Sequence, residues 1–123
     1  MSGERGSASL VAVAIVAMAT VLALGAADLA EVLIAESRAQ TAADAAALAA
    51  AQELAIPSGR DPAEVAAEYV ARNDGDLLEC SCARGAFEAT VRVRLDAGTL
   101  FLLGEARAVE AEARAVVDMG PPA

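Results

Sequence analysis

The sequence has few large side chains and few of the residues on which catalysis most often depends. Its 123 residues include one tyrosine, two phenylalanines and no tryptophan, so a soluble core must be built from valine, leucine and alanine. It has no histidine, the side chain used most often in general acid–base catalysis. No glycine-rich phosphate loop or nucleophilic-serine elbow is recognisable either. We therefore expect a non-enzymatic protein that uses no cofactor.

Positive charge is also scarce. Eighteen acidic residues oppose nine basic ones, which gives a formal charge of −9, and Glu4 and Arg5 cancel within the first 27 residues. The acidic excess therefore belongs to the later part of the chain. An acidic surface repels phosphate groups, which disfavours nucleic-acid binding. We expect no nucleic-acid partner and no small-molecule substrate.

Cysteine is limited to Cys80 and Cys82. In a regular strand their Cα atoms would lie about 6.6 Å apart, near the upper limit for a disulfide, so a bridge within the chain needs a local kink. A disulfide, within the chain or between chains, is favoured over two free thiols. Zinc usually takes four ligands, which two cysteines without histidine do not supply, so no metal site is expected.

What the sequence does contain is one long uncharged run of twenty residues, from Ala8 to Ala27. As a helix it would measure about 30 Å, the thickness of the hydrocarbon core of a bilayer. From Asp28 to Leu54 there is no glycine or proline and alanine dominates, so the helix should not end at the membrane. We predict one transmembrane and extended amphipathic helix over residues 8–55. A secretory signal cleaved near Ala26 is the competing interpretation.

The charges beside the span predict its orientation. Arg5 and the α-amino group precede it, whereas Asp28, Glu31 and Glu36 follow it. Basic residues favour the cytoplasmic side of a membrane. Residues 1–7 are therefore predicted to be a cytoplasmic segment of a single-pass cell-membrane protein whose C-terminal head is extracytoplasmic.

Beyond the span, the long helix should carry a packing face of small residues. Gln40 and Asp44 are polar and four residues apart, as expected on the wet side of an amphipathic helix. The other side is rich in alanine, which allows close approach of a neighbouring element. This predicted packing face consists of Ala43, Ala47, Leu48, Ala51 and Leu54. The sequence leaves open whether the face contacts the chain's own head or another subunit.

A second, short helix is predicted after a break in the chain. Pro57 and the glycine two residues later end the long helix. Asp61 is a suitable N-cap and Pro62 a suitable first helical residue. The helix should run to about Arg72, where a turn-forming segment follows.

The remainder of the predicted head, which covers residues 61–118, should be an antiparallel sheet. Period-two alternation begins at Leu77 and is clearest from Phe87 to Leu95, where alternate residues share one buried face. A third strand is predicted over residues 109–117, with a short helix as the alternative. Between them, Thr99–Gly104 is apolar on all sides and is either a buried helical turn or a membrane-proximal hydrophobic corner. The fold class is therefore α+β, and residues 119–123 should form a flexible tail.

Two segments resemble a known family. Gly6-Ser7-Ala8-Ser9 precedes the span, and the run R-x-Q-x-A-A-D-A-A-A-L-A-A-A follows it over residues 38–51. Together they resemble TadE/TadG-like Flp (tight adherence) pilus-assembly proteins, in particular short actinobacterial-type members, over about residues 3–55.

The resemblance implies a pilin-like or pseudopilin-like structural component of a Flp-type (type IV-like) pilus or secretion apparatus. Such a protein would act by helix packing in the membrane, with other pilin-like subunits as partners. The resemblance also implies a candidate processing site between Gly6 and Ser7. Processed relatives carry glutamate at the fifth mature position, whereas this chain has Val11 there. The alternative function is a membrane-anchored extracytoplasmic binding or regulatory module.

Overall fold

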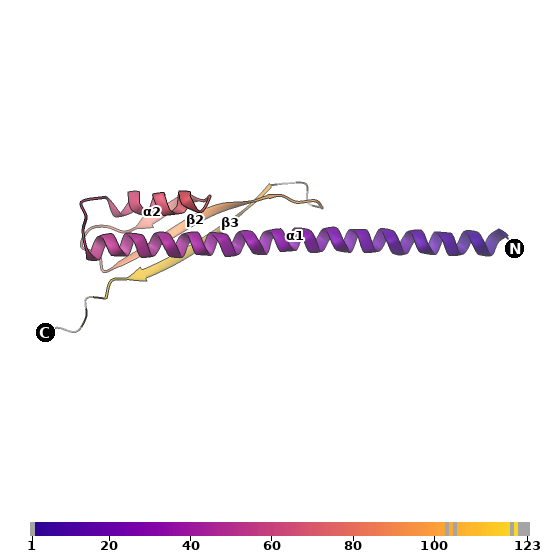
Figure 1. Cartoon of the computed structure of the whole chain (residues 1–123), viewed down its shortest axis with the longest axis horizontal. Coiled ribbons are helices and arrows are strands. Elements are labelled where there is room, and N and C mark those ends of the chain that lie inside the picture. The colour runs from indigo at the N-terminus through magenta and orange to yellow at the C-terminus, as the bar shows by residue number, and fades with distance from the viewer. Residues whose placement is uncertain (1, 103, 105, 119, 121–123) are drawn as a thin grey trace.

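A single uninterrupted helix, α1 (Ser2–Ala55), forms nearly half of the chain in the computed structural model. Its 54 residues extend for about 81 Å. The N-terminal half of α1 projects alone, and the rest of the chain lies along the C-terminal half (Figure 1). The structure describes residues 2–102, 104, 106–118 and 120. The predicted long helix is therefore present and passes through Gly25 without a break, and the segment before residue 8 continues it from Ser2.

The short helix α2 (Pro62–Arg72) begins and ends where its capping residues predict. The Asp61 carboxylate caps it by accepting a hydrogen bond from the backbone N–H of Ala63 at 3.0 Å. A tight turn then brings the chain to the sheet. A Cβ atom on Gly75 would lie 3.1 Å from methyl groups of both Val70 and Val93, so only glycine fits this approach without displacing its neighbours.

Three strands form an antiparallel sheet in the order β1 (Asp76–Ser81), β2 (Glu88–Thr99) and β3 (Ala106–Val116). With the two helices, this sheet confirms the predicted α+β fold. The third segment is a strand and not the alternative short helix. The alternation in β2 buries Ala89, Val91, Val93 and Leu95, as predicted. The prediction that Phe87 shares this buried face is wrong: it precedes the first residue of β2 and its side chain is exposed, although its carbonyl still accepts a hydrogen bond from the Val117 N–H at 2.7 Å.

The core lies between the C-terminal half of α1, the sheet and α2. α1 packs against β2, β3 and α2, and α2 also contacts β1. The side chains of α1 in this core are almost all alanines, and they face the valines of β2 and α2. The short alanine side chains let the backbone of α1 lie close to β2 and α2, so this core is thin and depends on small residues.

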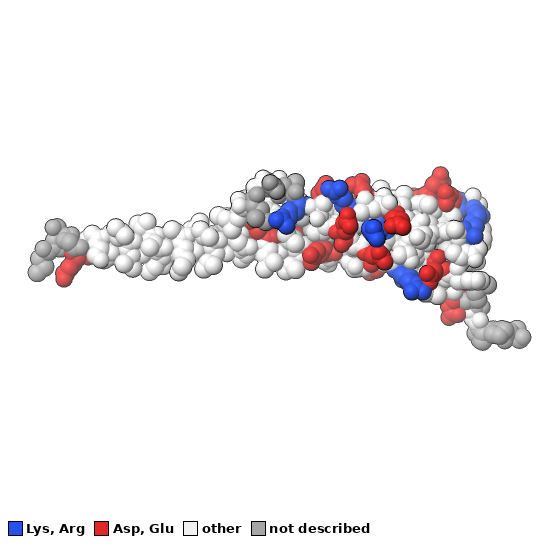
Figure 2. Space-filling model, turned by 180° about the vertical axis from the view of Figure 1, so that it is seen from behind, with Lys and Arg blue, Asp and Glu red and all other residues white. Residues whose placement is uncertain are grey.

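Charge divides the molecule along its long axis. Between Glu4 and Asp28, the projecting half of α1 carries only Arg5 as a charged residue. On the face that Figure 2 shows, this half is white apart from an acidic side chain near its N-terminal end, and acidic and basic side chains gather over the head. The predicted tail, residues 119–123, lies outside the described residues except for Gly120.

Candidate membrane and helix-packing surfaces

The projecting half of α1 is long and apolar enough to cross a membrane. It contains an 18-residue window with a mean hydropathy of 2.6, and none of that window is buried within the chain. A helix that is apolar on all sides and has no protein around it suits a bilayer interior. The rod therefore fits a single-pass membrane protein.

Exposed large apolar side chains lie on all sides of the span, and six of them form a continuous seam along one side of α1. Their spacings of four, three and seven residues place them on one stripe, as in the seams along which helices pair. The seam continues past Asp28, since Leu29 is 60 % exposed and Leu33 is 56 % exposed. All of its members are exposed: Val11, Ile15, Met18, Leu22, Leu29 and Leu33.

Another side of the span has a shallow, open surface on which small residues lie beside two valines, at spacings of three and four. Small residues at such spacings let helices approach closely in a membrane. The lining residues are Ser9, Ala12, Val13, Val16 and Ala17.

The predicted alanine packing face contacts the chain's own head. Ala43, Ala47 and Ala51 are buried in the core, and Leu54 is partly buried against it. Leu48 alone points away and is 56 % exposed. In this structure the alanines therefore hold the head on α1, and Leu48 is the member of the face that remains open to another chain.

A polar contact supports this docking of the head. Gln40 Nε2 donates to Asp44 Oδ1 at 2.9 Å and to the backbone carbonyl of Glu112 in β3 at 3.3 Å. Gln40 and Asp44 belong to the run that carries the family resemblance. One amide thus links that run to the sheet across 72 residues of sequence.

Asp28 has a role that the sequence did not reveal. Asp28 is only 7 % exposed, and its carboxylate accepts two backbone hydrogen bonds from the β2–β3 turn. The N–H of Phe101 donates to Oδ1 at 2.7 Å, and the N–H of Leu102 donates to Oδ2 at 2.8 Å. From the sequence, Asp28 is only the first charge after the span. The one sequence signal for this contact is the apolar segment Thr99–Gly104, because its large side chains need a surface to lie against.

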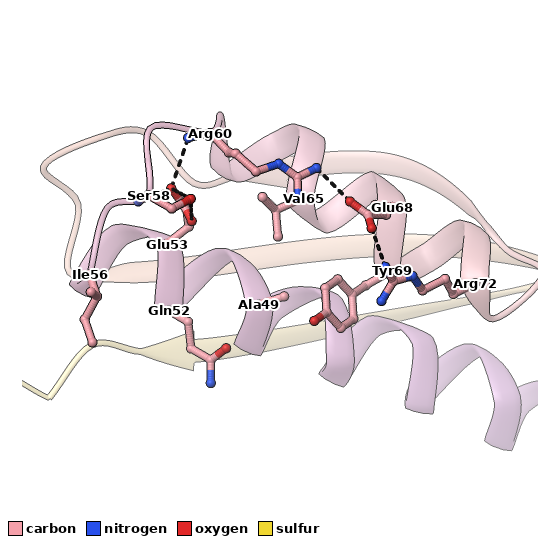
Figure 3. A pocket seen from close by; sticks show the side chains of 10 residues that line it. All are labelled: Ala49, Gln52, Glu53, Ile56, Ser58, Arg60, Val65, Glu68, Tyr69 and Arg72. Carbon is pink, nitrogen blue, oxygen red and sulfur yellow. Dashed lines mark hydrogen bonds and ion pairs between the residues drawn. The ribbon is translucent and has the colours of Figure 1, made fainter.

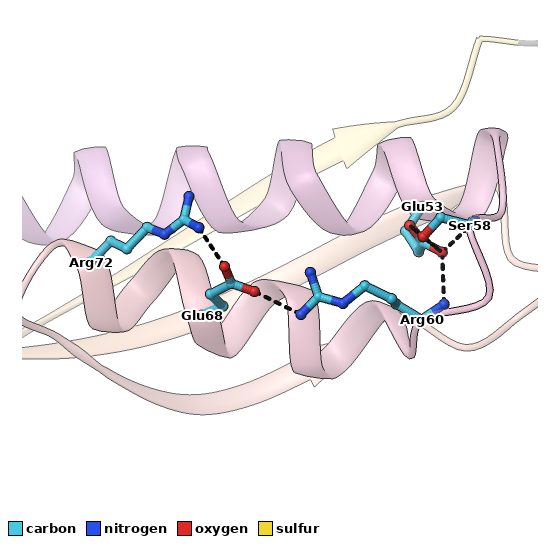
Figure 4. A network of polar contacts seen from close by, with 5 residues as sticks. All are labelled: Glu53, Ser58, Arg60, Glu68 and Arg72. Carbon is cyan, nitrogen blue, oxygen red and sulfur yellow. Dashed lines mark hydrogen bonds and ion pairs between the residues drawn. The ribbon is translucent and has the colours of Figure 1, made fainter.

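The head has a hollow of about 420 Å³ between the end of α1 and α2 (Figure 3). Tyr69, Val65 and Ile56 form part of its wall, together with charged side chains. Glu68 pairs there with Arg60 at 2.7 Å and also with Arg72, so these charges already have partners within the chain (Figure 4). This hollow is where the alternative of a binding module would place a ligand.

The corner between α1 and α2 is closed by Glu53 (Figure 4). Its carboxylate accepts hydrogen bonds from the Ser58 hydroxyl at 2.8 Å, the Ser58 N–H at 2.7 Å and the Arg60 N–H at 3.2 Å. The pKa of Glu53 is lowered from its ordinary 4.5, chiefly by the Ser58 hydroxyl and next by the Ser58 N–H. The charged carboxylate is thus the form that holds the corner.

Glu53→Gln should therefore lower the thermal stability of the head at neutral pH, with a small effect because the site is exposed. Because the pKa of Glu53 is lowered in the folded state, its charged carboxylate stabilises the head at pH values above the unfolded-state pKa, which is near 4.5. This stabilisation is lost as the pH falls through the folded-state pKa. The difference between the variant and the parent should therefore disappear in acid. Ser58→Ala in the same melting experiments should cause much of the same loss of thermal stability, and the double variant should lose little more. If the two single losses add up in the double variant at neutral pH, Ser58 is not the group through which Glu53 stabilises the corner.

The two cysteines are joined in the structure. Cys80 lies in β1 and Cys82 just after it, with their Cα atoms 5.5 Å apart and a disulfide between them. This separation is shorter than in a regular strand, so the chain is locally compressed there. Cys82 is buried in the core beside the sheet. The bridge thus fixes the chain where it leaves β1.

The candidate processing residues lie in the first turns of α1. Gly6 and Ser7 are helical and exposed, and nothing outside the helix lies within 4 Å of where a Cβ on Gly6 would be. Both precede the uncharged run. Cleavage between them would leave the span and the head intact.

A membrane-type helix that carries a small α+β head defines the class of this protein. Residues 6–53 match the model of a family described as Flp pilus-assembly TadE/G-like. The chain therefore carries a TadE/G-like segment, which confirms the family resemblance and supports a component related to Flp pilus assembly. The match also suggests a structural, non-enzymatic protein. No curated protein matches the chain, and no solved structure does.

Proposed function

We propose that this protein is a pilin-like structural component of a Flp-type pilus or secretion apparatus and acts by helix packing in the membrane. The matched segment consists of the span and the alanine-rich half of α1, which together make one rigid rod. The head is held on that rod through buried alanines and the Gln40 contact. A rod with a fixed head suits a subunit that is placed side by side with others.

The observation that carries this proposal is the exposed seam of α1. Lipid can cover the part of the seam within the span. Leu33, however, lies five residues beyond Asp28, past the charged Glu31, and is still exposed. Large apolar side chains at that level are best covered by another helix, and the heptad-like spacing of the seam is the spacing that helix pairs use.

The membrane arrangement follows from the same rod. We place the N-terminus in the cytoplasm and the head outside the membrane, because Arg5 precedes the span and the acidic residues follow it. Other pilin-like subunits in the same membrane would then meet the seam along its whole length. Gly6–Ser7 stays the candidate processing site, since cleavage there preserves every residue of the seam.

Photo-crosslinking in native membranes tests the proposal. A photoreactive amino acid at Leu33 should give cross-links to another helical subunit. The matched control is Ile34, which is also exposed but lies about 100° around the helix from Leu33. Cross-links from Leu33 and not from Ile34 would support packing through the seam. Only monomer from both positions, or equal products from both, would refute it.

A further inference from the structure

We propose that the β2–β3 turn is a second membrane contact, in which Phe101 and Leu102 insert into the lipid beside α1 and Asp28 holds the turn in place. This inference uses the span of α1 but none of the pilus partners. The surface it assigns is lipid-binding: the headgroup region and the upper part of the acyl chains.

The turn lies along α1 at the point where the uncharged run ends. Asp28 is the first residue after the uncharged run, and its carboxylate binds the N–H groups of Phe101 and Leu102. A Cβ atom on Gly25 would lie 3.6 Å from Leu102 Cδ1. Leu102 therefore reaches one helical turn further toward the N-terminus than Asp28, alongside a residue of the span. Figure 1 shows the connected ends of β2 and β3 alongside the middle of α1, where its N-terminal half begins to project alone.

The turn also exposes two large apolar side chains. Phe101 is 72 % exposed and Leu102 is 49 % exposed, whereas the preceding Leu100 is buried. Phe101 is one of only two phenylalanines in the chain. Large apolar side chains that continue the exposed surface of a membrane span have the same natural cover as the span itself, which is lipid.

Backbone N–H groups of the turn have hydrogen-bond partners within the chain. A turn can enter lipid only if its N–H and C=O groups have partners, because no water is present to bind them. Among the described residues of the turn, the N–H groups of Phe101 and Leu102 donate to Asp28, and the Gly104 N–H donates to the Leu100 carbonyl at 2.9 Å. The two carboxylate oxygens of Asp28 thus satisfy the N–H groups of Phe101 and Leu102 from one position on α1. Asp28 is thus a positioning residue for the insertion.

Tryptophan fluorescence in bilayers tests this, because the chain has no tryptophan of its own. Full-length Phe101→Trp in phosphatidylcholine vesicles should emit at shorter wavelength than in water. Lipids brominated near the headgroup should quench it more strongly than lipids brominated at mid-chain. The matched control is Phe87→Trp, an equally aromatic and exposed position at the opposite end of β2. It should be quenched by aqueous acrylamide and not by bromolipid.

Two further variants separate the causes. Val16→Trp reports the span itself, and mid-chain bromines should quench it. If Val16→Trp is quenched but Phe101→Trp behaves like Phe87→Trp, this inference is wrong and the membrane span stands. If Val16→Trp also escapes bromolipid, both the inference and the membrane placement of the proposed function fail. Shielding of Phe101→Trp from acrylamide and bromolipid alike would indicate a protein cover and overturn the lipid assignment.

Asp28→Asn in the Phe101→Trp background tests the positioning role. Asparagine keeps the size of the side chain but offers one acceptor oxygen, so bromolipid quenching should fall toward the level of the Phe87 control. Glu31→Gln removes one negative charge from an exposed site nearby and should leave the quenching unchanged. Unchanged quenching in Asp28→Asn would overturn the role assigned to Asp28.

Discussion

Val16→Arg should raise the apparent free energy of membrane insertion by about 3 kcal/mol and leave much of the protein outside the bilayer. Val16 lies near the midpoint of the Ala8–Ala27 run and is exposed in the structure, so no group of the described chain is beside it to neutralise a charge. From that depth the guanidinium cannot reach either interface easily. Microsomal insertion with a glycosylation reporter, or alkaline carbonate extraction of native membranes, measures the effect.

Val116→Arg is the matched control, because Val116 is an exposed valine on β3 in the head. The same substitution there should change insertion negligibly and stability by no more than about 0.5 kcal/mol. Normal insertion of Val16→Arg would mean that the uncharged run is covered by protein and not by lipid. The cross-links expected from the seam would then extend around the whole helix.

The elements of this fold could be predicted because their signals are local. The uncharged run, the absence of glycine and proline after it and the capping residues of α2 each act over a few residues. The alternation in β2 likewise fixes which side of the strand is buried. It could not place Phe87, because the alternation continues in the sequence past the first residue of β2, Glu88, to a side chain that the rest of the chain does not cover.

The contacts that join the head to α1 could not be predicted in the same way. Asp28 and the turn that it binds are 73 and 74 residues apart, and a charge at the end of a span is usually exposed to water. The alanine face was recognised, but a run of methyl groups specifies close approach and not the identity of the neighbour. Only the folded chain shows that β2 and α2 occupy most of it.

Ala46→Leu should destabilise the head by about 1–3 kcal/mol and release it from α1. Ala46 is fully buried in the cluster that contains Val91 and Val93, so the three extra carbon atoms of leucine must displace close-packed neighbours. Leucine is nearly as good a helix former as alanine, so α1 itself should remain helical. Hydrogen exchange in detergent micelles should therefore show faster exchange in β2 and β3 while the amides of the span stay protected.

Ala67→Leu is the control, because it makes the same substitution on α2 at an exposed position. It should leave exchange in the sheet unchanged, since leucine there meets solvent. Equal behaviour of the two variants would mean that the sheet does not press on the alanines of α1 in the membrane-bound protein. Those alanines would then be free to contact a neighbouring subunit, and the packing surface of the rod would include them as well as the seam.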